Sequence, residues 1–164
     1  MAGAILICGK LCSGKSYYAE KIKSKYNAVV LSCDEVTLAL GCVFDSSQFD
    51  EMLIRVKEYL LKKSAEIIAA GVNVILDWGF LTKAERNSTM NFFKRRNISC
   101  EIHYIDISDE VWHRNIAERN EAVAVGRVSA YYVDEELTEK LERIFEKPAA
   151  YEVGVWIRNE RENV

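Results

Sequence analysis

The stretch from residue 4 to residue 16 constrains the fold more than any other part of the sequence. An apolar run from Ala4 to Cys8 predicts a short buried strand, and it leads directly into the pattern G-x-x-x-x-G-K-S at residues 9–16. Glycines in this pattern let the backbone fold into a nest whose N–H groups face phosphate oxygens. The strand before the pattern and the helix expected after it favour a phosphate-binding loop over a chance match.

The residues of this predicted loop have separate expected roles. Lys15 supplies positive charge for the β- and γ-phosphates of a nucleotide, and the Ser16 hydroxyl is placed to ligate Mg²⁺. The helix that follows adds the positive end of its dipole to the same site. We expect the nucleotide to contact a continuous set of residues: Gly9, Lys10, Leu11, Cys12, Ser13, Gly14, Lys15, Ser16 and Tyr17.

The rest of the chain alternates between strand and helix patterns. Apolar runs predict four further strands, over residues 28–33, 72–77, 100–107 and 154–157. Helical spacing lies between them, and the segment 122–132 is expected to be a loop. Such alternation predicts a parallel sheet with helices on both faces. No linker or repeat divides the sequence, so we expect a single domain over residues 1–164.

Several polar residues are candidates for helix caps. Ser46 or Ser47 can begin a long amphipathic helix that Gly71 ends, and Thr82-x-x-Glu85 is a capping box that opens the next helix. Each of these positions fits an ordinary structural role, which fixes element boundaries without implying chemistry.

Composition limits the partners of the chain. Its 164 residues are 49% hydrophobic and 29% charged, which is typical of a soluble globular protein. A net charge of −3 gives no general attraction to nucleic acid or acidic membranes, so a nucleic-acid end as substrate would need a local basic patch. The basic run at residues 94–96 fits a helix end better. No stretch approaches the ~20 apolar residues that span a bilayer.

The five cysteines are odd in number and include no C-x-x-C pair. Cys8 and Cys33 lie in predicted strands, which favours buried free thiols. The start of the sequence resembles no secretory signal. We therefore expect a reducing, cytoplasmic environment.

Carboxylates follow the second and third predicted strands. Ligands of parallel sheets bind beyond the carboxyl ends of the strands, so these side chains are expected beside the phosphate loop. Asp77 is the candidate second holder of Mg²⁺, with a turn or helix cap as the alternative. Asp34 is the candidate general base for an acceptor hydroxyl, or else a helix cap, and Glu35 is an alternate for either role.

The residues after Asp77 suggest a substrate pocket. Trp78 and Phe80 are candidates to line it, although packing beneath a loop explains them equally well. Arg86 lies one helical turn beyond the cap and either reaches into the same cleft or pairs with a neighbouring acid. His103 lies within an apolar strand, which favours a core position over a catalytic one.

A cluster of arginines follows the fourth strand. Arg114 and Arg119 would stabilise charge on a transferring phosphoryl group if a lid over roughly residues 114–132 closes on the site. Arg127, beside a glycine in this segment, is a further candidate for nucleotide contact. The alternative is a solvated helix face on which the arginines pair with Glu118 and Glu121.

With these residues placed, residues 5–148 resemble the P-loop kinase group, including polynucleotide 5′-kinase, chloramphenicol phosphotransferase and zeta-toxin-like enzymes. The stretch from Leu76 to Arg86 is similar to a more local signature of bacterial ATP-binding proteins. The resemblance implies a three-layer α/β/α P-loop NTPase fold with sheet order 2-3-1-4-5 and a small helical lid. It also implies phosphoryl transfer from ATP, with Asp34 at the acceptor-activating position and arginines in the lid.

One departure from the family pattern lies inside the loop. Leu11 and Cys12 replace the usual small or proline residues, and the position of Cys12 beside Lys15 raises the hypothesis of a redox-sensitive loop.

Two functions remain open from the sequence. The first is a cytoplasmic kinase that moves the γ-phosphate of Mg²⁺-ATP to a hydroxyl of an unidentified small-molecule or nucleotide-type acceptor. The alternative is an ATP-binding or ATP-hydrolysing switch that has no acceptor.

Overall fold

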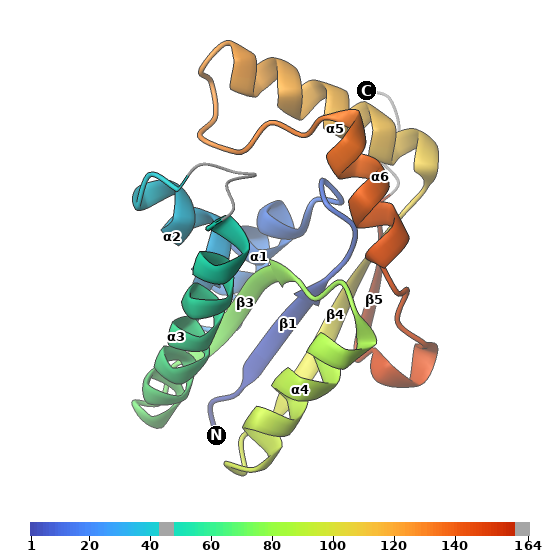
Figure 1. Ribbon diagram of the computed structural model, residues 1–164. Coiled ribbons are helices and arrows are strands. Elements are labelled where there is room, and N and C mark those ends of the chain that lie inside the picture. The colour runs from blue at the N-terminus through green and yellow to red at the C-terminus, as the bar shows by residue number, and fades with distance from the viewer. Residues whose placement is uncertain (43–47, 160–164) are drawn as a thin grey trace.

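The computed structural model describes residues 1–42 and 48–159, and these form a parallel sheet between layers of helices (Figure 1). The five strands are β1 (Ala4–Cys8), β2 (Ala28–Ser32), β3 (Asn73–Gly79), β4 (Cys100–Ile107) and β5 (Val155–Asn159). Their order in the sheet is β2-β3-β1-β4-β5, and every neighbouring pair is parallel. The predicted three-layer fold and strand order are therefore confirmed.

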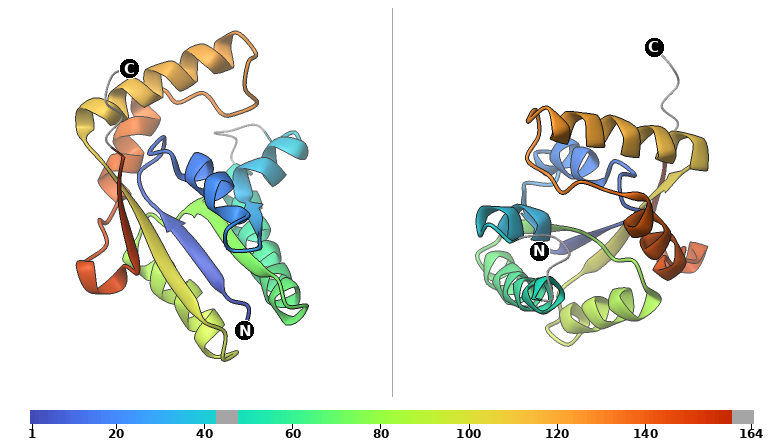
Figure 2. Two further views of the ribbon diagram at one scale, coloured as in Figure 1. Left: turned by 180° about the vertical axis from the view of Figure 1, so that it is seen from behind. Right: turned by 45° about the horizontal axis from the view of Figure 1, so that its top comes forward.

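The helices occupy three places around this sheet. They are α1 (Lys15–Lys23), α2 (Cys33–Ala39), α3 (Phe49–Ala69), α4 (Lys83–Lys94), α5 (Asp109–Ala124), α6 (Glu135–Ile144) and the short 3₁₀ helix η1 (Ala150–Glu152). Helices α3 and α4 cover one face and α1 covers the other, while α5 and α6 lie across the carboxyl ends of the strands (Figures 1 and 2). Among the described helices, none has the length and apolar character that crossing a bilayer requires.

The central strand β1 supplies side chains to the hydrophobic core on both faces of the sheet. Leu6 packs in a cluster with Ile68 of α3 and Phe93 of α4, whereas Ile7 packs in a second cluster with Ala19 of α1. Alternation along the strand sends neighbouring side chains to opposite faces. Each fully buried side chain of this size stabilises the fold by about 1.5–3 kcal/mol. The core thus fixes the strand whose carboxyl end begins the loop.

Element boundaries follow local hydrogen bonds. The Ser32 hydroxyl accepts a hydrogen bond from the Glu35 N–H at 3.3 Å, so Cys33 begins α2 where the sequence suggested the end of a strand. The Thr82 hydroxyl accepts from the Glu85 N–H at 3.1 Å, which confirms Thr82 as the N-cap of α4, whereas the Glu85 carboxylate of the predicted capping box pairs with Lys57. Helix α5 continues into the segment expected as a loop. The proposed caps at residues 46 and 47 lie outside the described residues.

Candidate active site

The loop between β1 and α1 depends on glycine at two positions. A Cβ atom added at Gly9 would lie 2.9 Å from the backbone oxygen of Ile105, which is closer than real Cβ contacts. Gly14 has φ 94°, in the left-handed region, and an added Cβ would lie 2.9 Å from the side-chain amide of Asn159. Glycine tolerates both the backbone angle and the close approach. The two glycines of the motif therefore allow the loop to lie tightly against β4 and β5.

Side chains from distant elements hold the outer side of the loop. The carbonyls of residues 11–13 accept hydrogen bonds from Trp112 Nε1 at 2.6 Å, Asn115 Nδ2 at 2.9 Å and Asn159 Nδ2 at 2.8 Å, in that order. Carbonyl and N–H groups point in opposite directions across a trans peptide bond. These bonds therefore fix the direction of the N–H groups on the other side of the loop.

The contacts of Trp112, Asn115 and Asn159 with the loop were not predicted from the sequence. Trp112, Asn115 and Arg119 have i, i+3 and i+7 spacing, which places them on one face of α5, and that spacing was a usable signal. The Arg119 guanidinium also lies 3.6 Å from the Cys12 sulfur. Asn159 carries no comparable signal, because its contact with the loop spans 146 residues of sequence.

The motif lysine lies inside the loop. Lys15 Nζ donates to the carbonyl of Lys10 at 2.6 Å. Burial lowers the pKa of Lys15, and the nearby Asp77 carboxylate opposes that shift. A partly desolvated ammonium group gains strongly from a nearby anion. The position of Lys15 therefore favours binding of a phosphate group.

The Ser16 hydroxyl and the Asp77 carboxylate form a close oxygen pair. Ser16 Oγ donates to Asp77 Oδ2 at 2.6 Å. Burial raises the pKa of Asp77, while the hydrogen bond from Ser16 and the charge of Lys15 act in the opposite direction. Hydroxyl and carboxylate oxygens are the ligands that Mg²⁺ accepts, with water and phosphate completing its coordination. The pair therefore fits Mg²⁺ held together with a nucleotide. Within the described residues, no cluster of three His, Cys, Asp or Glu side chains offers a separate metal site.

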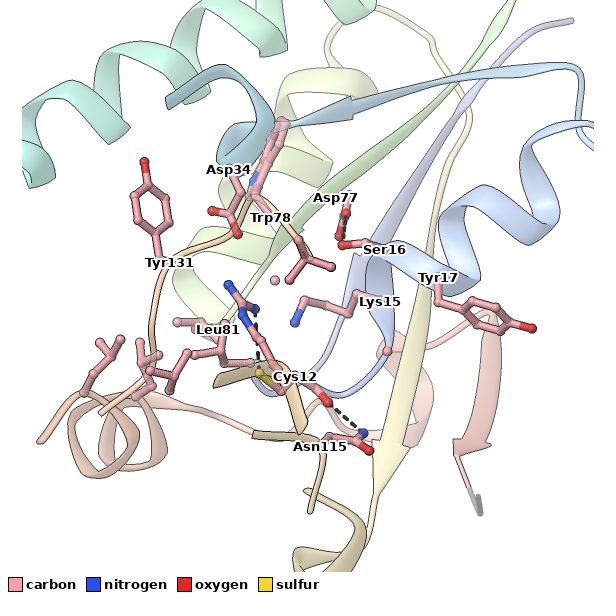
Figure 3. A pocket seen from close by; sticks show the side chains of 18 of the residues that line it. Cys12, Lys15, Ser16, Tyr17, Asp34, Asp77, Trp78, Leu81, Asn115 and Tyr131 are labelled. Atoms are coloured by element: carbon pink, nitrogen blue, oxygen red, sulfur yellow. Dashed lines mark hydrogen bonds between the residues drawn. The ribbon is translucent and has the colours of Figure 1, made fainter. Parts of the chain in front are cut away.

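A cavity of about 480 Å³ opens beside the loop. In Figure 3, Lys15 points into it, and Asp34 and Trp78 lie together on one wall. The predicted site residues among its lining are Leu11, Cys12, Gly14, Lys15, Ser16, Tyr17, Asp34, Asp77, Trp78 and Arg119. The carboxyl ends of β1 and β3, the start of α2 and one face of α5 thus meet at this cavity.

Unpartnered polar atoms gather at the same place. Within residues 1–42 and 48–159, the buried side-chain atoms that have no hydrogen-bond partner are Ser13 Oγ, Asn115 Oδ1 and Arg119 Nε. Buried polar groups are normally hydrogen-bonded, so orphaned atoms mark a place where a partner is expected. All three belong to the phosphate loop or to the face of α5 against it, as expected for a site that binds a polar ligand.

The structure assigns two predicted substrate residues to the interior. The Phe80 side chain is fully buried and packs in the core cluster beneath β1 and β3. Arg86 is 1% exposed, pairs with Glu152 at 3.1 Å and donates to the carbonyls of Phe80 and Glu146 at 3.3 and 2.9 Å. Of the two alternatives for Arg86, the structure shows pairing with an acid. Phe80 and Arg86 both lie outside the cavity lining. Their expected contact with substrate is corrected accordingly.

The other candidates outside the cavity lining are Gly9, Lys10, Ser13, Glu35, Arg114 and Arg127. The Lys10 ammonium pairs with Asp109 at 3.0 Å and lies over the Trp112 ring, so its side chain connects the loop to α5. Glu35 is exposed at the start of α2, and Arg114 does not line the cavity. The Arg127 side chain is exposed and lies 3.8 Å from Glu121.

Two interpretations of buried residues are confirmed. His103 has no exposed surface; its Nδ1 lies 3.0 Å from the Tyr18 hydroxyl and its Nε2 lies 3.0 Å from a Glu101 oxygen. Cys8 and Cys33 are buried free thiols, and burial raises their pKa to about 11 and about 12. These residues belong to the core and not to the site.

The fold and the loop define a P-loop nucleotide-binding protein, and comparison with known proteins narrows the class. Residues 5–148 match the family model described as AAA domain, so the chain belongs to that family. No curated protein sequence matches the chain significantly.

Several solved structures with similar folds are kinases. A putative kinase from Chloroflexus aurantiacus superposes with a TM-score of 0.72 at 16% identity, covering 96% of this chain and 84% of that one. A sugar kinase from Janibacter gives a TM-score of 0.65 at 15% identity, covering 96% and 86%. The APS kinase CysC of Mycobacterium tuberculosis, in complex with AMPPNP and APS, gives 0.64 at 15% identity, covering 98% and 90%. The fold of this chain is therefore that of the P-loop kinases.

Proposed function

We propose that this chain is an ATP-dependent kinase that transfers the γ-phosphoryl group to a hydroxyl group of a small acceptor. The observation that carries the proposal is the convergence of Lys15, the Ser16–Asp77 pair and Asp34 on one cavity. A switch that only binds nucleotide has no use for a carboxylate beside the phosphate loop, and a cavity of about 480 Å³ is far larger than the single water that hydrolysis needs. The arrangement therefore favours transfer to an acceptor over simple binding or hydrolysis.

Asp34 is the proposed general base. Its carboxylate accepts the proton of the acceptor hydroxyl as the acceptor oxygen forms a bond to the γ-phosphorus. The bond from that phosphorus to the β–γ bridging oxygen breaks, and ADP leaves with the bonding electrons. The proton passes from Asp34 to water. Exposure of Asp34 on the cavity wall supports this role because the carboxylate is open to solvent and to a ligand.

Positively charged groups beside the phosphate loop would surround the transferring group. Lys15 and the loop N–H groups are proposed to bind the β- and γ-phosphates, and Arg119 is proposed to stabilise charge on the oxygens as the phosphoryl group moves. Ser16 and Asp77 would hold Mg²⁺, which neutralises phosphate charge when bound. The unpartnered Nε atom of Arg119 supports its role, since it has a donor left for an oxygen ligand.

The similar structures support a kinase reaction and leave the acceptor open. They include a sugar kinase, a gluconokinase, a shikimate kinase and a complex of APS kinase with AMPPNP and APS. The compounds that these names give differ from one another, so similarity of fold does not identify the acceptor of this chain. We accordingly propose ATP as phosphoryl donor and derive the acceptor from the cavity of this chain.

Transfer of labelled phosphate tests the proposal. The protein is incubated with Mg²⁺ and ATP labelled at the γ-phosphate, together with a mixture of small hydroxylated compounds. We expect label on an organic product and ADP formation that rises with the mixture, with Lys15→Met as the blank. Label released only as inorganic phosphate, at a rate independent of the mixture, would contradict the proposal and support a hydrolysing switch.

A further inference from the structure

The cavity has two chemically different ends. The phosphate end contains Lys15 and the Ser16–Asp77 pair. The other end is formed by α2, α3, residues 78–81 and residues 128–141, and we name it the acceptor end. Of the described side chains that these segments contribute to the lining, Asp34 is the only charged one.

Aromatic and aliphatic side chains form the walls of the acceptor end. Phe49 and Leu53 come from α3, and Trp78 and Leu81 from the segment that ends β3. Tyr131 faces this space from the opposite side in Figure 3. These five side chains come from three separate stretches of the chain. Together they make a largely apolar wall around Asp34, and α5 completes the lining of the cavity with Glu118, Arg119 and Ala122.

The hydroxyl group of Tyr131, one of the aromatic side chains of this wall, already has a hydrogen-bond partner. The Tyr131 hydroxyl donates to the carbonyl of Cys42 at 3.3 Å, and the Tyr131 ring meets the Phe49 ring edge-on at 5.5 Å. A hydroxyl occupied in this way contributes little to polar recognition of a ligand, whereas the ring remains an apolar surface. The wall is therefore suited to packing against a ring of the acceptor.

Charge and hydrogen bonding exclude several acceptor classes. A carboxylate, sulfate or phosphodiester group at this end would meet the negative charge of Asp34, and the one arginine among the described lining residues of the cavity, Arg119, is assigned above to the transferring phosphate. A sugar would bury several hydroxyl groups against aliphatic and aromatic side chains, and unpaired buried hydroxyls cost free energy. An acceptor that suits this end needs an apolar body and one hydroxyl near Asp34.

We propose that the acceptor is an uncharged alcohol or phenol with an apolar, ring-containing body. This proposal rests on the kinase function proposed above, because it assigns the chamber beside Asp34 to the phosphoryl acceptor. The cavity volume of about 480 Å³ also has to hold the transferring phosphate. Ligand pockets of roughly 300–1,000 Å³ hold drug-sized molecules, so the acceptor has roughly one or two rings.

Binding without transfer is the first test. The probes are 3-phenylpropan-1-ol and 2-(4-hydroxyphenyl)ethanol, compared with glucose, gluconate and a short oligonucleotide with a free 5′-hydroxyl. Each is titrated against the full chain with Mg²⁺ and the non-hydrolysable analogue AMPPNP, and binding is followed by ligand-observed NMR. We expect at least one aromatic alcohol to bind at least about tenfold more tightly than the sugar, the acid and the oligonucleotide. Tighter binding of any of those three would overturn the proposal.

A pair of neighbouring residues on α3 provides matched variants. Leu53 lines the cavity, whereas Ile54 is 58% exposed and does not line it. Leu53→Asn is expected to weaken binding of the aromatic alcohol about tenfold, and Ile54→Asn is expected to leave it unchanged. Val128→Asn, at a lining position that is 45% exposed, is a second variant in case Leu53→Asn fails to fold. Unchanged probe affinity in the folded cavity variants would contradict the proposal.

Labelled ATP then separates this inference from the kinase proposal. Label on an aromatic alcohol supports the kinase proposal and the acceptor proposal. Preferential label on a sugar, acid or oligonucleotide supports the kinase proposal but overturns the proposed class of acceptor. If the aromatic probe binds and responds to Leu53→Asn but no compound is labelled, the chamber is an apolar ligand site and the kinase proposal fails.

Discussion

The phosphate end of the cavity is held by hydrogen bonds from α5 and β5, whereas the acceptor end is made of apolar walls around Asp34. At the phosphate end, three side chains fix successive loop carbonyls, and Ser16 is bonded to Asp77. At the acceptor end, side-chain shape and the position of one carboxylate determine what can bind. Under the proposed function, nucleotide binding would depend on the direction of polar groups, while acceptor choice would depend on the size and polarity of the walls. Substitutions at the two ends should therefore have separable effects.

Removal of the motif lysine tests the phosphate end and has the largest expected effect. Lys15→Met should lower phosphoryl transfer by about 10²–10³-fold for every acceptor, because one preorganised charge on the phosphates is lost. Turnover with Mg²⁺-ATP is the measurement, and Lys21→Met, an exposed position on the same helix, is the control. If the loss in Lys15→Met differed from one acceptor to another, the effects of the two ends would not be separable, which would contradict the account.

The two arginines Arg119 and Arg127 provide a second comparison. Arg119 lies against the loop and lines the cavity, whereas Arg127 is exposed and lies near Glu121. Arg119→Gln should lower kcat by about 10²-fold, since a charge near the transferring group is lost. Arg127→Gln should change it less than about twofold, because exposed ion pairs contribute little. Equal losses in both variants would indicate that residues 114–132 act as a closing lid, as the sequence analysis expected.

The outer bonds of the loop give the smallest predicted effect. Asn115→Leu removes the donor to the Cys12 carbonyl, and loss of one such bond costs about 1 kcal/mol. The affinity for ATP should therefore fall about fivefold, as measured by calorimetric titration, with no change in the preference among acceptors. Asn91→Leu, at an exposed position on α4, is the matched control. A changed acceptor preference in Asn115→Leu would show that the two ends are coupled.

The phosphate end was largely predictable from the sequence, because its chemistry lies in one short motif. The bounds predicted for β1 and β4 agree with the structure, since both strands are apolar runs that cross the core. Asp77 was found by its place after a buried strand, and its bond to Ser16 supports the expected pairing. The contacts of Trp112 and Asn159 with the loop were not predictable, because they arise only when distant elements pack together.

At the acceptor end, two residues that are close in sequence, Trp78 and Phe80, occupy different environments. Trp78 and Phe80 both follow Asp77 closely, but the chain turns at Gly79, which has φ 87°, and Phe80 has φ 48°. This turn leaves Trp78 on the cavity wall and sends Phe80 into the core, where Arg86 binds its carbonyl. A turn set by two positive φ angles is not visible in hydrophobic periodicity. The walls from α3 and residues 128–141 were unpredicted for the related reason that they meet only in the folded chain.

The most direct test of the kinase account is the separation of ATP binding from transfer at Asp34. In Asp34→Asn, the side chain keeps its shape but loses the base, so transfer to the acceptor should fall by about 10²–10⁴-fold while the affinity for Mg²⁺-ATP stays within about twofold. Glu35→Gln, at the adjacent exposed residue outside the cavity lining, should behave as the unsubstituted protein. Full transfer activity in Asp34→Asn, or equal loss in both variants, would contradict the account.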